Sequence, residues 1–231
     1  MKVAILGGTG SFGRALAARL AAIGEDDVVI GSRDAERAAA AAAELGGRVS
    51  GATNDDAVRD VELAVLAVNA TAALDTARAV AQPLGTTPLL CVASAIRFEK
   101  GHGMLPDPDA ASLAERVQHA VGAPVAAGLH SVAASSLEHA PDEDALVCGD
   151  DEAAKALALE LAGRIVDGRA LDAGPLACAR ALEGLTAVIV NLNRRYKAHA
   201  GIRVTGVGST EPARSEAAGS AGSGSGHSGV R

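Results

Sequence analysis

The sequence predicts an α/β fold, a doubly wound parallel sheet followed by a small helical part at the C-terminus. Three observations favour it. Short apolar runs typical of buried parallel strands recur along the chain, helical stretches separate them, and the glycine-rich turn GGTGSFG joins the first run to the first helix. With 231 residues, 48% of them hydrophobic, the chain can bury a large core.

The expected strands share short length and an almost wholly apolar character. They are residues 3–6, 28–30, 63–68, 89–93, 125–129 and 145–147. Because a helix is expected between successive strands, the crossovers should be right-handed and the strands parallel, as in Rossmann-type folds.

The helices follow from apolar periodicity and from capping residues at their ends. The first is expected over residues 11–23, with Gly24 as its C-terminal cap. The second is alanine-rich, takes Asp34 as its N-cap and stops at Gly46. The remaining helices are expected from residue 69 to residue 80, from near residue 109, and from residue 152 to residue 165.

From Pro175 onward the chain changes character. The stretch PLACARALEGLTAVIVNLNRRY starts with a proline suited to a first helical turn and is apolar on nearly every face over residues 185–192. We therefore expect a packed helical appendage or a two-fold interface that makes the chain a homodimer. This divides the chain into a Rossmann-type domain of residues 1–174, a helical part of residues 175–206, and a Gly/Ser-rich tail of residues 207–231 that should stay disordered.

Charge and cysteine content narrow the function classes. The net charge of −7, without a run of Lys or Arg, argues against a nucleic-acid partner. Cys91, Cys148 and Cys178 are odd in number and lack metal-ligand spacing, which predicts reduced thiols and no metal site. The chain starts with a strand rather than a signal peptide, and no apolar run reaches the roughly 20 residues of a membrane span. A cytoplasmic protein without a membrane partner is expected.

The glycines of the first turn form the pattern Gly8-x-Gly10-x-x-Gly13. An isolated match is more often only a turn, but here a strand precedes it and a helix follows, which is the context of a dinucleotide-binding site. Gly8 would permit the tight turn, Gly10 would let a pyrophosphate touch the backbone, and Gly13 would let helix pack on strand. The unpaired N–H groups of the helix then face the anion.

The second strand ends in basic residues where NAD-binding proteins place an acid for the ribose. Arg33 follows the last glycine by 20 residues, with Ser32 beside it and Arg37 one helical turn later. Guanidinium groups can grip a 2′-phosphate that a carboxylate would repel, so NADP is favoured over NAD. The alternative is a solvated helix face in which these arginines pair with Asp34 and Glu36.

A resemblance to a known family covers residues 1 to about 206. The opening "MKVAILGGTGSFGRALAARLA…VVIGSRDAERA", with "VCGDDEAAK", "LDAGPLACARALEGLTAVIVNLN" and "RYKAHAGIRVTG" in order after it, is similar to the NADPH-dependent coenzyme F420 reductases. The resemblance implies reversible hydride transfer between NADP(H) and the deazaflavin coenzyme F420 in a homodimer. Asn69 and Ala70 stand where proline and tryptophan are typical of the family, and HSVAA replaces an HTIPA-like stretch, which makes the deazaflavin loop less rigid.

The resemblance also assigns roles to residues of this chain. It implies that Thr9, Ser32, Arg33 and Arg37 hold the phosphates of NADP, that the loop after Val68 borders the nicotinamide, and that residues 130–132 lie against the deazaflavin. Together with the glycine motif, the predicted cofactor-binding residues are Gly8, Thr9, Gly10, Ser11, Phe12, Gly13, Ser32, Arg33, Arg37, Val68, Asn69, His130, Ser131 and Val132.

Hydride transfer between two planar rings needs positioning more than acid–base chemistry, so no catalytic residue is predicted beyond a contribution from His130. That histidine follows an apolar strand and could hydrogen-bond a ring carbonyl or the deazaflavin, or simply tie its loop to the backbone. Two other functions stay open, an NADP-dependent reductase of a small imine or carbonyl and a non-catalytic NADPH-binding protein.

Three further groups of polar residues have modest expected roles. Asp150 and Asp151 are expected to cap the next helix. Arg180 and Glu183 lie one turn apart and could form a helical pair. A weakly basic loop could meet the anionic tail of the deazaflavin cofactor or stay solvated. Its basic residues are Arg97, Lys100 and His102.

Overall fold

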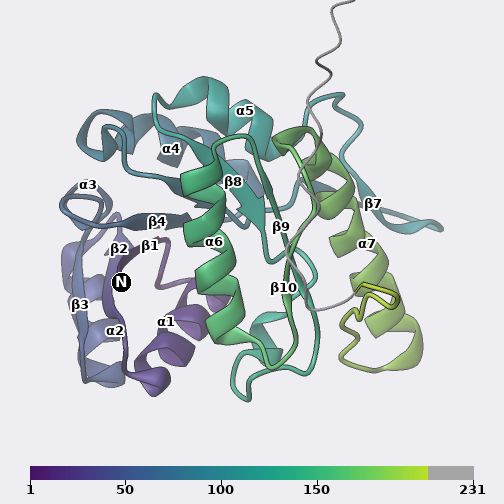
Figure 1. The fold of residues 1–231 in the computed structure, drawn as a ribbon, viewed down its shortest axis with the longest axis horizontal. Coiled ribbons are helices and arrows are strands. Elements are labelled where there is room, and N and C mark those ends of the chain that lie inside the picture. The colour runs from purple at the N-terminus through teal and green to yellow at the C-terminus, as the bar shows by residue number, and fades with distance from the viewer. Residues whose placement is uncertain (208–231) are drawn as a thin grey trace, which may run out of the picture.

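The computed structural model describes residues 1–207 as an eight-stranded sheet with helices on both faces, a separate hairpin, and a long C-terminal helix (Figure 1). Apart from Val207, the predicted tail lies outside the described residues. The strands are β1 (Lys2–Leu6), β2 (Asp27–Ser32), β3 (Val49–Thr53), β4 (Leu63–Leu66), β5 (Leu89–Cys91), β6 (Ile96–Glu99), β7 (Gly103–Pro106), β8 (Val125–Gly128), β9 (Ala145–Gly149) and β10 (Ala170–Asp172). The α-helices are α1 (Ser11–Ile23), α2 (Ala35–Leu45), α3 (Asn54–Ala57), α4 (Ala70–Leu84), α5 (Leu113–Ala120), α6 (Glu152–Ile165) and α7 (Ala179–Tyr196). Two short 3-10 helices are η1 (Ala134–Ser136) and η2 (Leu176–Cys178).

The strand order is β10-β9-β8-β5-β4-β1-β2-β3. Every pairing from β3 to β8 is parallel, which confirms the predicted Rossmann-type sheet. The prediction of a parallel strand is wrong at β9, which pairs antiparallel with β8, and the strand β10, which was not predicted, pairs parallel with β9. No helix long enough for a crossover separates β8 from β9, so the chain returns antiparallel.

The predicted helices agree with the structure most closely where capping residues are present. Asp34 caps α2 by accepting hydrogen bonds from the N–H groups of Glu36 and Arg37 at 3.0 and 3.2 Å. Asp151 accepts from the N–H of Ala154 at 2.8 Å and starts α6 where expected. The fourth predicted helix, α5, begins later than expected because Ser112 forms a capping box there.

Alternate residues of the central strands supply two separate cores. Ala4 and Leu6 point to the face covered by α4, α5 and the start of α7. Val3 and Ile5 point to the opposite face, which is covered by α1, α2 and α6. The central strands are thus buried on both sides of the sheet, which explains why they read as continuous apolar runs.

Helix α7 begins on the face of the sheet that carries Ala4 and Leu6 and packs along the hairpin of β6 and β7 and the neighbouring α5 (Figure 1). By length and hydropathy alone, Leu176–Tyr196 is long and apolar enough to cross a membrane, contrary to the expectation that no apolar run reaches that length. Core helices of proteins outside membranes pass the same test. Here the segment includes the buried carboxylate of Glu183, which is hydrogen-bonded to backbone N–H groups.

Candidate functional site

The predicted site residues gather at one edge of the sheet. Because β1, β2, β4, β5 and β8 are parallel, the loops that follow them emerge together. The loops after β1 and β4 are in close contact, since a Cβ added to Gly7 would lie 2.5 Å from Cγ1 of Val68. In open α/β sheets this carboxyl edge is where ligands bind.

The turn between β1 and α1 is held by backbone hydrogen bonds and by close packing. The N–H of Gly7 donates to the carbonyl of Gly31 at 3.0 Å, and that of Gly10 donates to the carbonyl of Gly7 at 2.9 Å. The left-handed backbone lies at Gly7, with φ of +77°, and not at Gly8 as the motif suggested. Gly8 is needed for another reason, because a Cβ there would lie 2.9 Å from both Cγ2 of Ile30 and the carbonyl oxygen of Ile5.

The other two glycines of the motif differ from each other. A Cβ on Gly13 would lie 2.6 Å from the carbonyl oxygen of Gly7, so this residue lets α1 pack against the turn, as predicted. A Cβ on the exposed Gly10 would meet only that same carbonyl, at 3.2 Å. Gly10 therefore leaves open the space in front of the turn, where a ligand would approach.

The N-terminus of α1 is suited to an anion. Its N-cap is Gly10, which supplies no side-chain cap, and its first turn contains no acidic residue. The N–H groups of the first turn have no partner inside the helix and carry the positive end of its dipole. Around them, Thr9 is half-buried, Ser11 is exposed, and Phe12 packs against the core.

Arg33 and Arg37 are exposed just beyond the end of β2, and neither forms an ion pair within residues 1–207. The alternative of pairing with Asp34 and Glu36 is not what the structure contains, because the Asp34 carboxylate caps α2. Ser32 is buried, and its hydroxyl oxygen accepts a hydrogen bond from the N–H of Asp34 at 3.2 Å. Two guanidinium groups are thus available where a ribose phosphate would lie.

The loop after β4 carries Val68 and Asn69. Asn69 is exposed and occupies the N-cap position of α4, but its side chain makes no capping hydrogen bond. Its amide is therefore available to a ligand at the carboxyl edge.

His130 follows β8 and is buried after a residue, Leu129, with φ of +63°. Its Nδ1 lies 2.8 Å from the carbonyl oxygen of Gly128, which can only accept, so Nδ1 carries the proton. Burial lowers the pKa of His130 to about 4 and keeps the ring neutral. Nε2 is then a buried hydrogen-bond acceptor, and within residues 1–207 it has no partner.

The tautomer with the proton on Nδ1 bears on both roles expected of His130, a hydrogen bond to a ligand and a hydrogen bond that ties its loop to the backbone. The histidine does tie its loop to the backbone, as one alternative held. The neutral ring cannot donate from Nε2, so the expected bond to a ring carbonyl does not fit. A ligand N–H or O–H group fits Nε2 instead.

The next two predicted residues face inward. The hydroxyl of Ser131 donates to the carbonyl of Asp144 at 3.5 Å, and Val132 is 5% exposed within the core beneath α1 and α6. Their side chains are therefore directed away from a ligand, and only their backbone is left to contact one. The sequence pattern did not show whether these residues would contact a ligand through their side chains or through their backbone.

Helix α7 contributes contacts that the sequence analysis missed. The Thr186 hydroxyl donates to the carbonyl of His130 at 2.7 Å and lies 2.7 Å from the hydroxyl of Ser94. Glu183 accepts from the N–H groups of Ala95 and Ala114 at 3.4 and 3.2 Å, in place of the expected helical pair. Burial raises the pKa of this carboxyl. These contacts join residues far apart in the chain, so no local pattern could reveal them.

Comparisons with known proteins agree with this geometry. A family profile described as "NADP oxidoreductase coenzyme F420-dependent" matches residues 2–91. The chain is 40% identical over 225 residues to a protein named F420-dependent NADP reductase from Methanothermobacter marburgensis, covering 89% of this chain and 98% of that protein. A protein of the same name from Methanocaldococcus jannaschii is 34% identical over 223 residues, with the same coverage.

Solved structures extend the comparison to the fold. A crystal structure described as an F420-dependent NADP reductase from Arthrobacter sp. FB24 matches with a TM-score of 0.76 and 28% identity, over 88% of this chain and 99% of that one. Plasmodium falciparum pyrroline carboxylate reductase with NADP bound matches with a TM-score of 0.57 and 11% identity, over 85% of this chain and 64% of that one, a likeness of fold alone. From its similarity to the curated reductases along nearly their whole length, the chain belongs to the family of F420-dependent NADP reductases.

Proposed function

We propose that the carboxyl edge of the sheet is where this chain performs the reaction of its family, the reversible transfer of a hydride between NADP(H) and coenzyme F420. The observation that carries this assignment is the acid-free N-terminus of α1 beside two arginines that form no ion pair within the described residues 1–207. That combination suits a dinucleotide with a phosphate on its ribose and disfavours one with a free 2′-hydroxyl.

The nucleotide half is held by backbone and by charge. The N–H groups of the first turn of α1 bind the pyrophosphate, with the open face of Gly10 toward it. Arg33 and Arg37 bind the 2′-phosphate, and the Ser32 hydroxyl stands beside them. Asn69 borders the nicotinamide, and its side-chain amide makes no capping hydrogen bond to α4.

The deazaflavin half is held by the loop after β8. His130 offers Nε2 to an N–H or O–H group of the ring system, and its backbone is fixed by Thr186. The buried side chains of Ser131 and Val132 anchor the loop to the protein interior and do not touch the ring. Nε2 is buried and has no partner in the described part of the chain, which supports a ligand here, because a buried acceptor without a partner is costly.

The reaction itself is supplied by the two cofactors, which exchange a hydride between nicotinamide and deazaflavin when their rings are stacked. The chain contributes position. Its loops would hold the two rings with the reacting carbons at the roughly 3–3.5 Å that such transfers need, and this positioning supplies most of the acceleration in such reactions. A neutral His130 adds orientation without donating a proton.

The direct test is to mix the protein with NADPH and coenzyme F420 and follow the deazaflavin absorbance. Rapid bleaching is expected. If NADPH binds and the deazaflavin stays oxidised, the assignment fails, and two alternatives remain. Turnover of a cyclic imine or a ketone in the same assay would indicate an imine or carbonyl reductase, and no turnover of either would indicate an NADPH-binding protein.

A homodimer formed through α7 is part of the proposal. Val188, Leu192 and Tyr196 recur at i, i+4 spacing on one stripe of the helix and are 52%, 39% and 68% exposed. An apolar stripe of this kind on a described surface suits a two-fold contact between copies. Light scattering at micromolar concentration should give about twice the chain mass, and Leu192→Asp should halve it. A parent protein that is monomeric at that concentration would reject the dimer.

The domain division and the compartment complete the proposal. We assign residues 1–174 to NADP binding and residues 175–206 to dimer formation, since η2 and α7 follow the last strand of the sheet. The three cysteines are free thiols, and Cys91 and Cys148 are buried, in keeping with a reducing cytoplasm. Fractionation of the native host should recover the activity with the cytoplasmic enzymes, and activity in the membrane pellet would contradict this.

A further inference from the structure

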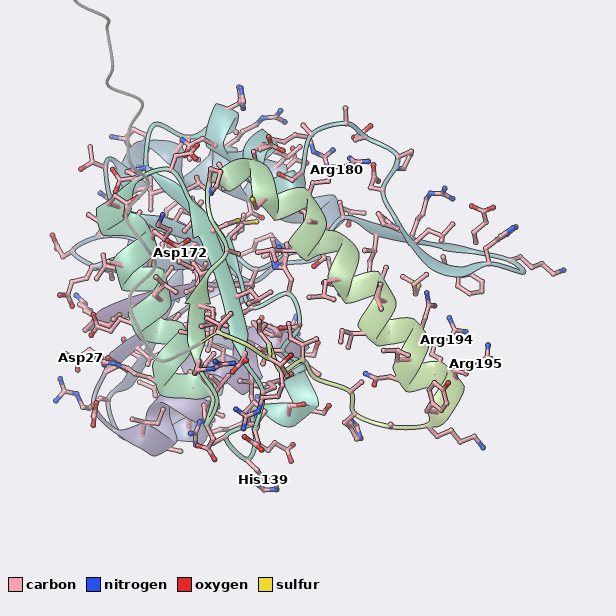
Figure 2. The ribbon with its side chains drawn as sticks, turned by 45° about the vertical axis from the view of Figure 1, so that its right-hand side comes forward. Asp27, His139, Asp172, Arg180, Arg194 and Arg195 are labelled. Carbon is pink, nitrogen blue, oxygen red and sulfur yellow. The ribbon has the colours of Figure 1, made fainter. Side chains whose placement is uncertain are left out.

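A hollow of about 400 Å³ lies between the hairpin and the last turns of α7. The hairpin supplies Phe98, His102 and Gly103, and the helix supplies Asn191, Arg194 and Arg195. Figure 2 shows Arg194 and Arg195 together at one end of α7, with Arg180 at the other. We call this hollow the hairpin pocket.

The hairpin pocket is built by specific contacts rather than by chance proximity. The Asn191 amide accepts from the N–H of Met104 at 2.8 Å and donates to the carbonyl of the same residue at 2.7 Å. A Cβ on Gly103 would lie 2.6 Å from Oδ1 of Asn191, so glycine lets the two elements approach. The guanidinium of Arg194 lies 4.9 Å from the centre of the Phe98 ring.

The charges at the hairpin pocket are mostly positive. Arg194 and Arg195 have no carboxylate partner within residues 1–207, and Lys100 lies at the hairpin tip in the same condition. Glu99 is the acidic residue of the hairpin, and it pairs with Arg97 and with His102. The negative end of the α7 dipole favours cations in its last turn, but it does not account for further cations on the hairpin opposite. In a chain of net charge −7, this concentration of positive charge marks a place for an anion.

The hairpin pocket is connected to the proposed deazaflavin site by α7 itself. Thr186 contacts the backbone of His130, and Arg194 follows eight residues later on the same helix. At 1.5 Å per residue, the two positions are about 12 Å apart along the axis. A ligand with its ring beside His130 and an extended anionic substituent along α7 would place that substituent at the arginines.

We propose that the hairpin pocket is a subsite for the anionic tail of the deazaflavin co-substrate, an inference that rests on the proposed function. Arg194 and Arg195 bind phosphate or carboxylate oxygens of the tail. The two hydrogen bonds between the Asn191 amide and the backbone of Met104 hold the hairpin beside these arginines. The subsite contributes affinity and leaves the ring geometry to the loops of the carboxyl edge. It therefore distinguishes a tailed deazaflavin from one that ends at the ribityl group.

The test is to titrate two oxidised ligands into the protein by calorimetry, coenzyme F420 and the same 8-hydroxy-5-deazaflavin carrying only a ribityl group. The double variant Arg194→Gln/Arg195→Gln should weaken coenzyme F420 by about three- to tenfold, the loss of two exposed charge pairs. It should leave the ribityl compound and NADPH unchanged. The control variant Arg59→Gln/Arg78→Gln removes the same charge from surface ion pairs elsewhere and should change neither ligand.

Salt supplies a second readout. Raising the ionic strength should weaken coenzyme F420 binding to the parent protein and should have little effect on the double variant. Equal weakening of both deazaflavins by the double variant, or equal effects of the two variant pairs, would overturn the subsite while leaving the hydride transfer intact. Failure of the parent protein to bind either deazaflavin would instead reject the proposed function and the subsite with it.

Discussion

The two halves of the candidate site are built in different ways. The nucleotide half consists of one continuous stretch, β1 to the first turn of α2, and it uses backbone N–H groups and exposed arginines. The deazaflavin half depends on His130, a buried histidine whose loop is held from α7, more than 50 residues later. The first is a local structure that a motif can describe, and the second exists only when distant parts of the chain have packed together.

This difference has a consequence for stability. The exposed arginines can change without disturbing the core, since neither contacts another charged group within residues 1–207. A change at His130 affects a buried ring, a left-handed turn and a contact with α7 together. Ligand affinity and folding should therefore be separable in the nucleotide half and coupled in the deazaflavin half.

The largest expected effect concerns the pH dependence of folding. The pKa of His130 is about 4 in the folded protein against 6.5 when exposed, so the unfolded chain binds the proton more readily. Stability contributed by the neutral ring is complete above pH 6.5 and is lost as the pH falls toward 4, by roughly 3 kcal/mol in total. Urea unfolding of the parent and of His130→Asn from pH 7 to pH 4 should show this loss only in the parent.

The comparison between parent and variant is needed because Glu143 acts in the opposite direction. Burial raises the pKa of its carboxyl to about 7, so its contribution is present at low pH and is lost as the pH rises from about 4.5 to 7. Both proteins retain Glu143, and its contribution cancels in the difference. Parallel pH profiles for parent and His130→Asn would contradict the buried, neutral histidine.

The second prediction tests the nucleotide half. Arg33→Ala should weaken NADPH by about 10- to 100-fold, because a hydrogen bond to a charged group contributes about 1.5–3 kcal/mol. NADH makes no such contact and should be unaffected, while Arg33→Asp should go further and offer NADH a ribose acceptor. The melting temperature should not change. The measurements are KM for both nucleotides and a thermal scan.

A matched control for Arg33 is Arg48→Ala, another exposed arginine, which pairs with Asp27 at the opposite end of β2. It should leave both KM values unchanged. An NADPH to NADH preference of Arg33→Ala within about threefold of the parent would remove the 2′-phosphate assignment, since that is a shift under 1 kcal/mol.

The third prediction addresses the deazaflavin half. His130→Ala removes a neutral acceptor, which contributes about 0.5–1.5 kcal/mol, so KM for coenzyme F420 should rise about two- to tenfold. The affinity for NADPH should stay nearly constant. If NADPH affinity fell while turnover at saturation was kept, His130 would belong to the other ligand.

The difference between local patterns and tertiary contacts also explains which elements could be predicted from the sequence. The strands next to β1, the caps at Asp34 and Asp151, and the glycine turn follow from local patterns, and the structure agrees with them. The strands β3 and β10 lack a continuous apolar run and were not predicted, because they are the two edge strands of the sheet and none of their residues is fully buried.

The site shows the same limit at the level of single residues. The inward orientation of Ser131 and Val132 and the role of Glu183 depend on tertiary contacts, and no spacing along the chain encodes them. The reversal of β9 and the hairpin of β6 and β7 belong to the same class.

The smallest expected effect is at Arg37, and it distinguishes the roles of Arg33 and Arg37 within the nucleotide half. Arg37 lies one turn into α2, with its backbone N–H bound to the Asp34 cap, and we expect its guanidinium to reach a 2′-phosphate from farther away than that of Arg33. Arg37→Ala should raise KM for NADPH by about two- to fivefold, in the range of an exposed ion pair. The effect should shrink as salt is added, since an exposed charge is screened over about 10 Å at 0.1 M. If Arg37→Ala exceeded Arg33→Ala, or if salt left its effect unchanged, the two arginines would have exchanged roles, with the closer contact at the helix and not at the strand end.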